Sequence, residues 1–188
     1  RIKQAVLNGA KLVVVDPRII ELARYADVHL QIRPGTNVPV FHAIANAIIE
    51  SGATDREFIE NRTIDFQKFT DLVREWTPER AAEIAGVDAA DIRRAAAVYA
   101  EAKPSMIFHG LGMTEHAQGT DGVRCLVNLA LLTGNIGKPG SGENPLRGQN
   151  NVQGSAHMGC EPSNLAGFTP IEVGAELFES VWGVPIPR

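Results

Sequence analysis

The sequence predicts an α/β fold, with a doubly wound, mainly parallel sheet and flanking helices. Short segments that resemble strands, at residues 11–15, 28–32 and 105–108, alternate with helical segments, which is typical of sheets covered by helices on both faces. The first run is almost entirely apolar and ends at Asp16, as expected for a strand buried on both faces. Beyond residue 149 this pattern stops, so we expect an irregular C-terminal segment.

The composition is that of an ordinary globular protein. Of the 188 residues, 44% are hydrophobic and 21% are charged, which is enough to bury a core. The formal net charge of -4 provides no basic surface, so we expect no nucleic-acid partner. No apolar run is long enough to span a membrane, so we expect no membrane partner. The chain begins without Met, as if inside a helix, and we interpret it as a fragment of a longer, cytoplasmic protein.

Helical periodicity fills most of the remaining chain. We predict a short helix that ends at Asn8-Gly9 and another near residues 19–25. Between residues 38 and 102 we predict five scaffold helices, because capping residues and apolar stripes recur at helical spacing. The residues expected to begin them are Thr36 or Asn37, Thr54 with its capping-box partner Glu57, Asp65, Thr77-Pro78 and Asp88. A further amphipathic helix at residues 121–133 should end at Gly134.

The apolar stripes of these helices are assigned to the core rather than to a cofactor pocket. They comprise Phe41, Ile44, Ala45 and Ile48 in the first scaffold helix, Phe66, Phe69, Leu72 or Val73 and Trp76 in the third, and Ile92, Ala95, Ala96 and Tyr99 in the fifth. Side chains at this spacing share one helix face and pack inward.

Polar loops follow the predicted strands. Asp16-Pro17-Arg18 follows the first strand, Arg33 to Asn37 the second, and a turn with two glycines, His109 to His116, the third. Ligands of open α/β sheets bind beyond the carboxyl ends of the strands, and an Asp there can accept from a guanine edge or a ribose hydroxyl. The alternative is that Asp16 and Asn37 only cap the following helices, and these residues alone favour that alternative.

The segment from Gly140 to Gly154 has neither helical nor strand periodicity. It carries several amide side chains and Arg147, the only formal positive charge between Lys138 and Arg188. Amides suit the edges of heterocycles, and a guanidinium binds a carboxylate or phosphate through two parallel hydrogen bonds. On composition alone a surface linker is the alternative.

The string Asn144-Pro-Leu-Arg-Gly-Gln-Asn-Asn-Val-Gln-Gly154 resembles the active-site loop of molybdenum formate dehydrogenase catalytic subunits, which are bis-molybdopterin-guanine-dinucleotide oxidoreductases. The segments Leu132 to Gly140 and Val15 to Arg18 also resemble this family, in the same order. The resemblance covers nearly the whole chain, and it implies a dinucleotide-binding-like α/β domain.

The resemblance also implies the roles of individual residues. Arg147 would be the catalytic residue that anchors formate. The residues implied to contact the cofactor are Val15, Asp16, Arg18, Gly35, Asn37, Gly110, Leu111, Gly112, Glu115, Gly148, Gln149 and Asn150. Three of these depart from the residues of many relatives, which have Asp at Asn37, Met at Leu111 and Gln at Glu115.

The implied cofactor is molybdenum or tungsten held by two pterin guanine dinucleotides, with formate as substrate. In the family the Cys or selenocysteine ligand, its neighbouring His and a 4Fe-4S cluster lie upstream, so we expect no metal ligand in this chain. Cys125 and Cys160 lack metal-site spacing. His109, His116 and His157 lie near the loops, but a lone His is more often structural. We therefore expect the isolated fragment to be inactive and the parent to require electron-transfer subunits.

The expected organisation is a partial cofactor-binding α/β domain at residues 1–149 and the incomplete opening segment of a second α/β domain at residues 150–188. In the latter only residues 172–180 resemble a helix. Three alternatives remain: another enzyme of the same cofactor family, such as a nitrate reductase; a nucleotide-binding module without redox activity; and a structural domain with a linker.

Overall fold

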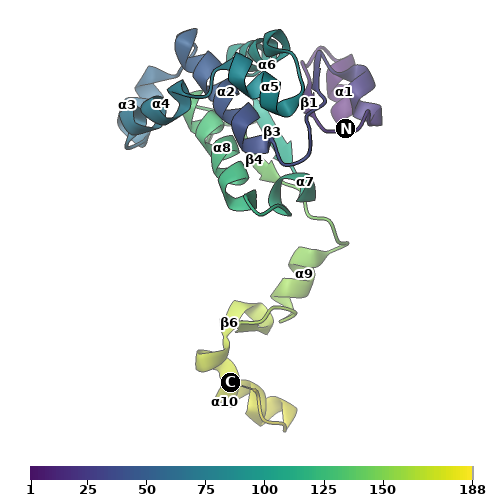
Figure 1. The fold of residues 1–188 in the computed structure, drawn as a ribbon. Helices are drawn as coiled ribbons and strands as arrows, with labels where there is room; N and C mark the ends of the chain where they lie inside the picture. The colour runs from purple at the N-terminus through teal and green to yellow at the C-terminus, as the bar shows by residue number, and fades with distance from the viewer. Residues whose placement is uncertain (188) are drawn as a thin grey trace. The chain divides into compact units, whose positions relative to one another are not determined.

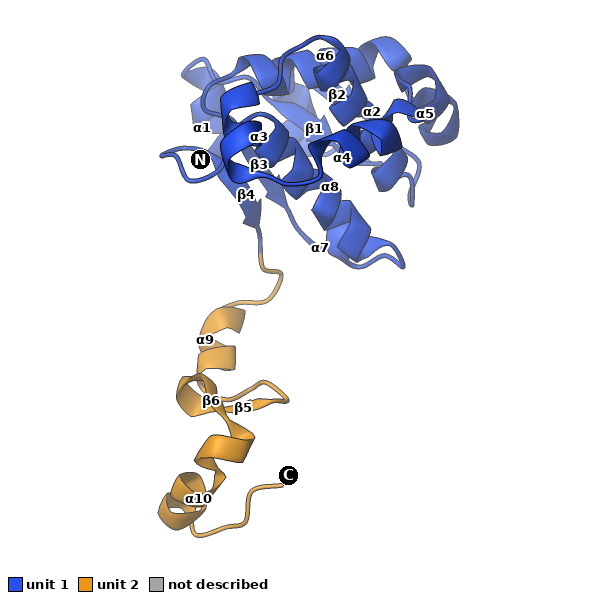
Figure 2. Cartoon of the chain, turned by 90° about the vertical axis from the view of Figure 1, so that its left-hand side faces the viewer, with its two compact units in different colours: residues 1–146 blue, residues 147–188 orange. Residues whose placement is uncertain are grey.

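The computed structural model describes residues 1–187. These residues fall into two compact units, one of residues 1–146 and one that begins at Arg147 (Figure 2). The elements of the first unit, labelled in Figure 1, are α1 (Ile2–Leu7), β1 (Val13–Val15), η1 (Glu21–Tyr25), β2 (Val28–Leu30), α2 (Asn37–Glu50), α3 (Arg56–Arg62), α4 (Phe66–Arg74), α5 (Pro78–Ala85), α6 (Ala89–Glu101), β3 (Met106–His109), α7 (Leu111–Thr114), α8 (Gly119–Leu132) and β4 (Gly142–Pro145).

The first unit has a mixed α/β architecture, as the sequence predicts. β1 pairs with β2 in parallel, with Val13 opposite Val28, and β3 pairs with β4 in parallel. Within the described residues these are two separate two-stranded sheets rather than one continuous sheet. The expectation that the first strand is buried on both faces is wrong: Val14 is buried, but Val13 and Val15 are only half-buried.

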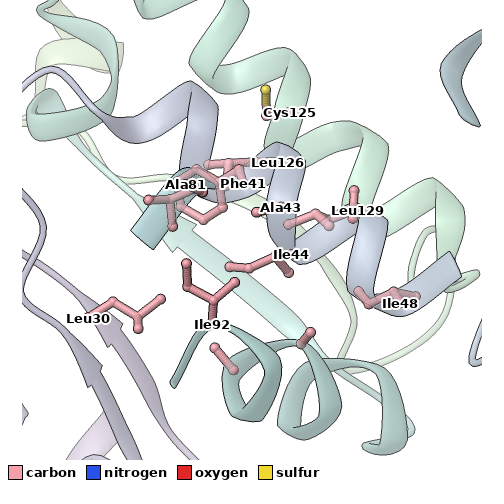
Figure 3. Close-up of a cluster of buried hydrophobic side chains, with 14 of the residues drawn as sticks. Leu30, Phe41, Ala43, Ile44, Ile48, Ala81, Ile92, Cys125, Leu126 and Leu129 are labelled. Carbon is pink, nitrogen blue, oxygen red and sulfur yellow. The ribbon is translucent and has the colours of Figure 1, made fainter. Parts of the chain in front are cut away.

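Helix α2 lies at the centre of the helical layer. It packs against α4, α5, α6 and α8, and Figure 3 shows its apolar side chains between α8 and α6. The predicted stripe of Phe41, Ile44, Ala45 and Ile48 is buried, and Ile48 has no exposed surface. The five scaffold helices, α2 to α6, are confirmed, and their stripes lie in the core or pack against it, with the exception of Trp76, which is outside the core cluster.

Local details at the helix ends differ from expectation in two places. Asp55, not Thr54, caps α3, because its Oδ1 accepts from the backbone N–H of Phe58 at 3.0 Å. Helix α4 ends at Arg74, so Trp76 lies beyond it. The centroid of the Trp76 ring is 4.4 Å from Cζ of Arg80. Thr77 caps α5 as predicted, its hydroxyl accepting from the N–H of Arg80 at 3.2 Å.

Strand β4 lies where the sequence suggests a loop without regular structure. Met106 is opposite Gly142 and His109 is opposite Pro145 in the parallel pairing. The side-chain amide of Asn144 also donates to the carbonyl of Ile107 at 3.1 Å. Gly, Asn and Pro are depleted in strands, so the residues of β4 carry no pattern that would have indicated it.

The second unit contains α9 (Val152–His157), β5 (Asn164–Leu165), η2 (Ala166–Phe168), β6 (Thr169–Pro170) and α10 (Ile171–Trp182). The expectation of one helix in an irregular segment is therefore wrong, because α9 and a small antiparallel pair of strands precede α10. The short α9 contains Gly154 and Ser155, which are weak helix formers, and it is too brief to show periodicity. No helix within residues 1–187 is long and apolar enough to cross a membrane.

Candidate functional site

A hydrogen bond connects the loop after β1 to β2. Oδ1 of Asp16 accepts from the backbone N–H of Arg18 at 2.8 Å, and the carbonyl oxygen of Asp16 lies 3.0 Å from Nε2 of His29. Asp16 therefore closes an Asx turn instead of capping a helix. Its second carboxylate oxygen has no hydrogen-bond partner in residues 1–187. Val15 is half-buried and Arg18 is exposed.

The loop after β2 leads directly into α2. Gly35 has a φ of +84°, in the left-handed region that favours glycine. Thr36 is the N-cap of α2 but makes no capping bond with its side chain, and Asn37 is the first helical residue. The interpretation of Asn37 as a helix cap is therefore wrong. Asn37 is buried, with 8% of its surface exposed, and its side-chain amide donates to the loop after β3.

The loop after β3 contains a single-turn helix rather than a plain turn. Gly110 is the N-cap of α7, Leu111 and Gly112 are exposed within it, and Glu115 follows it. At Gly112 an added Cβ would meet no atom within 4 Å, and no positive φ is recorded there. Neither the packing of the unit nor the local backbone requires glycine at this position, so there is open space beside the turn.

Two hydrogen bonds join the second loop to the third. Nδ2 of Asn37 donates to the carbonyl of Gly112 at 3.4 Å, and Nε2 of Gln118 donates to the carbonyl of Gly35 at 2.8 Å. The structure thus brings together Gly35, Asn37 and Gly112 from the predicted set. In the described residues no hydrogen bond connects the Asp16 loop to them. Gln118 was not predicted, because a single Gln before a helix carries no sequence signal.

In the second unit, the predicted residues Arg147, Gly148, Gln149 and Asn150 are all exposed and lie in irregular backbone before α9. Within residues 1–187 the guanidinium of Arg147 makes no ion pair, and the amides of Gln149 and Asn150 make no hydrogen bond. Side chains with unused donors and acceptors are available to a ligand.

Metal-binding residues are not gathered in the described part of the chain, which contains no cluster of three or more His, Cys, Asp or Glu that could hold a metal ion. Both cysteines are free thiols. Burial raises the pKa of Cys125 to about 12, so it is an inert core residue. Of the histidines near the loops, His109 contacts Glu143 and His157 packs edge-on against Phe168 at 4.5 Å.

A hollow of about 500 Å³ lies between β2, the first residue of the loop that follows it, and the helices α5 and α6. It contains no residue of the predicted site. Asp88 and Asp91 line it, and Arg33 in its wall already donates to the carbonyls of Glu83 and Ile84. Three acidic residues, Glu83, Asp88 and Asp91, line the hollow and disfavour an anionic ligand such as a dinucleotide, so this hollow is not a candidate for the cofactor.

Comparison with known proteins identifies the family. A family model described as molybdopterin oxidoreductase matches residues 1–173. The chain belongs to the molybdopterin oxidoreductase family. Membership implies a pterin cofactor that carries molybdenum or tungsten.

Individual relatives of this molybdopterin oxidoreductase chain include formate dehydrogenases. F420-dependent formate dehydrogenase subunit alpha of Methanocaldococcus jannaschii is 46% identical over 182 residues, or 97% of this chain and 27% of the relative. Formate dehydrogenase H of Escherichia coli is 45% identical over 179 residues, or 94% of this chain and 25% of the relative. Nitrate reductase of a Synechocystis species is 39% identical, with 86% of this chain and 23% of the relative covered.

A solved structure extends the likeness to the fold. Acetylene hydratase from Pelobacter acetylenicus superposes with a TM-score of 0.71 and 32% sequence identity, covering 73% of this chain and 19% of that protein. The chain thus spans about a quarter of the length of the formate dehydrogenases and less of this structure. Because relatives with different named reactions share the fold, the reaction depends on residues of the site and not on the fold.

The chemistry of several residues fits a pterin ligand. The space beside Gly112 allows a ligand to approach the backbone closely, and the free amides of Gln149 and Asn150 suit the donors and acceptors of a fused heterocycle.

Proposed function

We propose that the chain is part of the catalytic subunit of a formate dehydrogenase, which oxidises formate to CO2 by two electrons. In this proposal the cofactor is molybdenum or tungsten bound by two molybdopterin guanine dinucleotides, and a 4Fe-4S cluster lies in the part of the parent that precedes this chain. The chain supplies part of the dinucleotide site and the arginine that anchors the substrate.

The observation that carries the proposal is Arg147 in the string Asn144 to Gly154. Its guanidinium is exposed and has no partner within residues 1–187, and two formate dehydrogenases are 46% and 45% identical to the chain. A planar guanidinium can hold the two oxygens of a formate ion with parallel hydrogen bonds. Such a clamp fixes the orientation of the C–H bond, which is the main contribution expected from a residue that takes no electrons itself.

The remaining predicted residues would hold the cofactor, which when bound supplies the two-electron chemistry. Gln149 and Asn150 would hydrogen-bond the pterin, and the turn at Gly110 to Glu115 would lie against the pterin and phosphate. Asn37 uses Nδ2 for Gly112, which leaves its Oδ1 to accept from a guanine N–H. Asp16 uses one oxygen for Arg18, which leaves the other for a ribose hydroxyl or guanine edge.

We further propose that β1–β2 and β3–β4 belong to one doubly wound sheet in the complete protein. Met106 and Phe108 on β3 are exposed by 41% and 47%, which is unusual for strand residues of a parallel sheet. Strands and helices from the remainder of the parent would cover them. Residues 1–149 would then be a partial cofactor domain and residues 150–188 the start of a second α/β domain.

The test is to compare Arg147→Lys with wild type in the full-length parent enzyme. Lysine keeps the charge but loses the two-pronged geometry. We expect both proteins to retain their metal, measured by elemental analysis, while Arg147→Lys loses most formate-dependent dye reduction. Arg56→Lys is the matched control, because Arg56 is an exposed arginine on α3. Equal activity of Arg147→Lys and wild type would remove Arg147 from the site.

A second candidate is a nitrate reductase, since one such relative is 39% identical. Assaying the parent with formate and with nitrate separates the two reactions.

A third candidate is a nucleotide-binding module without redox chemistry. Such a module would bind GTP or GDP tightly without metal.

The proposed parent would also have electron-transfer subunits and a cytoplasmic location. Copurification with the tagged parent would test for the subunits, and cell fractionation would test the location.

A further inference from the structure

A buried contact joins the side chains of His109 and Glu143. His109 is the last residue of β3 and Glu143 lies in β4. In the parallel register Ile107 is opposite Glu143, so His109 and Glu143 are diagonal neighbours on one face. Nε2 of His109 meets Oε1 of Glu143, and the two side chains are only 6% and 15% exposed.

This contact is the only polar anchor of the imidazole within residues 1–187. Nδ1 and Nε2 of His109 and Oε1 of Glu143 are all buried, and none of the three makes a hydrogen bond of regular geometry within these residues. Burying a carboxylate and an imidazole is unfavourable unless they compensate each other. Within residues 1–187 the close approach of Nε2 to Oε1 is the polar contact that links these two side chains across the strands.

Strand β4 needs such a contact because its own sequence does not favour a strand. Gly142, Asn144 and Pro145 are all residue types depleted in sheets, and within the described residues β4 pairs with β3 alone. Beyond the backbone pairing, β4 is held by Glu143 on His109 and by the amide of Asn144 on the carbonyl of Ile107 at 3.1 Å.

The same histidine also fixes the end of the segment that leads to the arginine. The carbonyl oxygen of His109 accepts from the backbone N–H of Leu146 at 2.7 Å. Leu146 is the residue before Arg147, and consecutive Cα atoms are held about 3.8 Å apart. His109 thus contacts β4 through its side chain and Leu146 through its backbone.

We propose that His109 and Glu143 form a positioning pair. By holding β4, the pair fixes the backbone position from which the side chain of Arg147 reaches formate. The proposal rests on the function proposed above, in which Arg147 anchors the substrate. The pair does not touch formate. It acts by holding β4 in register with β3, which keeps the backbone of Leu146 in place.

The test uses the full-length parent enzyme with Glu143→Ala, and a charge swap that combines His109→Glu with Glu143→His. For Glu143→Ala we expect metal content to be unchanged and kcat/KM for formate to fall about 10- to 100-fold, mostly through KM, because small misplacements of a substrate anchor have effects of this size. The swap should recover most of the loss. Glu57→Ala, at an exposed carboxylate on α3, is the control and should match wild type.

Hydrogen exchange supplies a readout that does not depend on turnover. In Glu143→Ala the amides of residues 142–146 should exchange faster than in wild type, and in the swap they should return toward wild-type protection. Unchanged protection in Glu143→Ala would overturn the proposal, because the pair would then not hold β4. Loss of metal with activity would also overturn it, since the pair would then serve the cofactor and not Arg147.

Combining Glu143→Ala with Arg147→Lys separates this inference from the proposed function. If Arg147→Lys alone is silent, the proposed function fails and the positioning role fails with it. If Arg147→Lys is damaging and Glu143→Ala adds nothing in that background, the two residues act through one anchor, as residues in one unit do. If Arg147→Lys is damaging but the losses simply multiply, only the positioning role is wrong.

Discussion

Nε2 of Gln118 donates a hydrogen bond to the carbonyl of Gly35 at 2.8 Å, across 83 positions of sequence. Close by in sequence, Asn37 donates to Gly112. The loop after β2 and the turn after β3 are thereby connected at two places. Contacts of this kind keep ligand-binding loops in one arrangement before the ligand arrives, which reduces the ordering cost of binding.

We predict that Gln118→Ala weakens cofactor retention more than it weakens the fold. Losing one hydrogen bond should lower the free energy of unfolding by about 1 kcal/mol, because the carbonyl of Gly35 can turn to solvent. The pterin and metal content of the purified parent should fall below that of wild type. Gln67→Ala, at an exposed glutamine bonded to Asp71 one helical turn away, should leave the content unchanged. Full metal content in Gln118→Ala would contradict the prediction.

Gly112→Ala tests the open space beside α7. Because no atom lies within 4 Å of the added Cβ and Ala is the better helix former by about 1 kcal/mol, the thermal midpoint should hold or rise. Cofactor content should nevertheless fall, since the methyl group enters the space assigned to the ligand.

Gly119→Ala is the contrasting variant for Gly112. There an added Cβ would lie 2.2 Å from the carbonyl oxygen of Thr114, so stability itself should drop. If Gly112→Ala retains full cofactor, the ligand does not approach this turn.

Ile48→Ala should destabilise the chain by about 2 to 5 kcal/mol. Ile48 is completely buried on α2, and truncating it leaves a cavity where α2 packs on its neighbours. Urea unfolding followed by circular dichroism measures the change. Ile64→Ala, at a side chain that is 89% exposed, should shift the midpoint by less than about 0.5 kcal/mol.

His42 should make stability depend on pH. Burial lowers the pKa of His42 below its ordinary value of 6.5, and its Nδ1 is buried without a hydrogen-bond partner in the described residues. The unfolded chain then binds the proton more readily than the folded chain, so stability is full above about pH 6.5 and is lost as the pH falls through the lowered pKa. As the pH is lowered from 8 to 5, the urea midpoint of His42→Leu should fall less steeply than that of wild type. His157→Leu, at an exposed histidine, should keep the wild-type slope.

The two cysteines should differ in reactivity toward a thiol reagent. Cys160 is exposed and Cys125 is buried, with the pKa of Cys125 raised to about 12. Because the thiolate is the reactive form, native protein at pH 8 should label at Cys160 alone, and denatured protein at both. Mass spectrometry of the labelled peptides reads the result. Rapid native labelling of Cys125 would show that α8 is not packed as described.

The helices could be predicted because their apolar side chains recur at helical spacing. The stripe at Phe41, Ile44 and Ile48 repeats at helical spacing, and burial of that stripe forms the core. Helix ends were harder, because neighbouring residues such as Thr54 and Asp55 can both cap, and only the backbone angles decide between them.

Elements that depend on contacts between residues far apart in the sequence could not be predicted from local patterns. β4 has a poor strand sequence and exists through its pairing with β3 and the His109–Glu143 contact. The link from Gln118 to Gly35 likewise depends on two loops meeting in space. The predicted site residues came from a family resemblance, since composition alone favoured a linker. Local patterns cannot report pairings of high sequence separation.

The central place of α2 has a consequence for how the chain is made. Its packing against α8 cannot form until residues 119–132 have left the ribosome, and synthesis advances at about 5 to 20 residues per second. For several seconds the apolar side chains of the nascent α2 are therefore exposed to water or to whichever chaperone reaches them first. Slower translation between α2 and α8 would lengthen that interval, and the yield of folded protein should depend on how well this stretch is protected during synthesis.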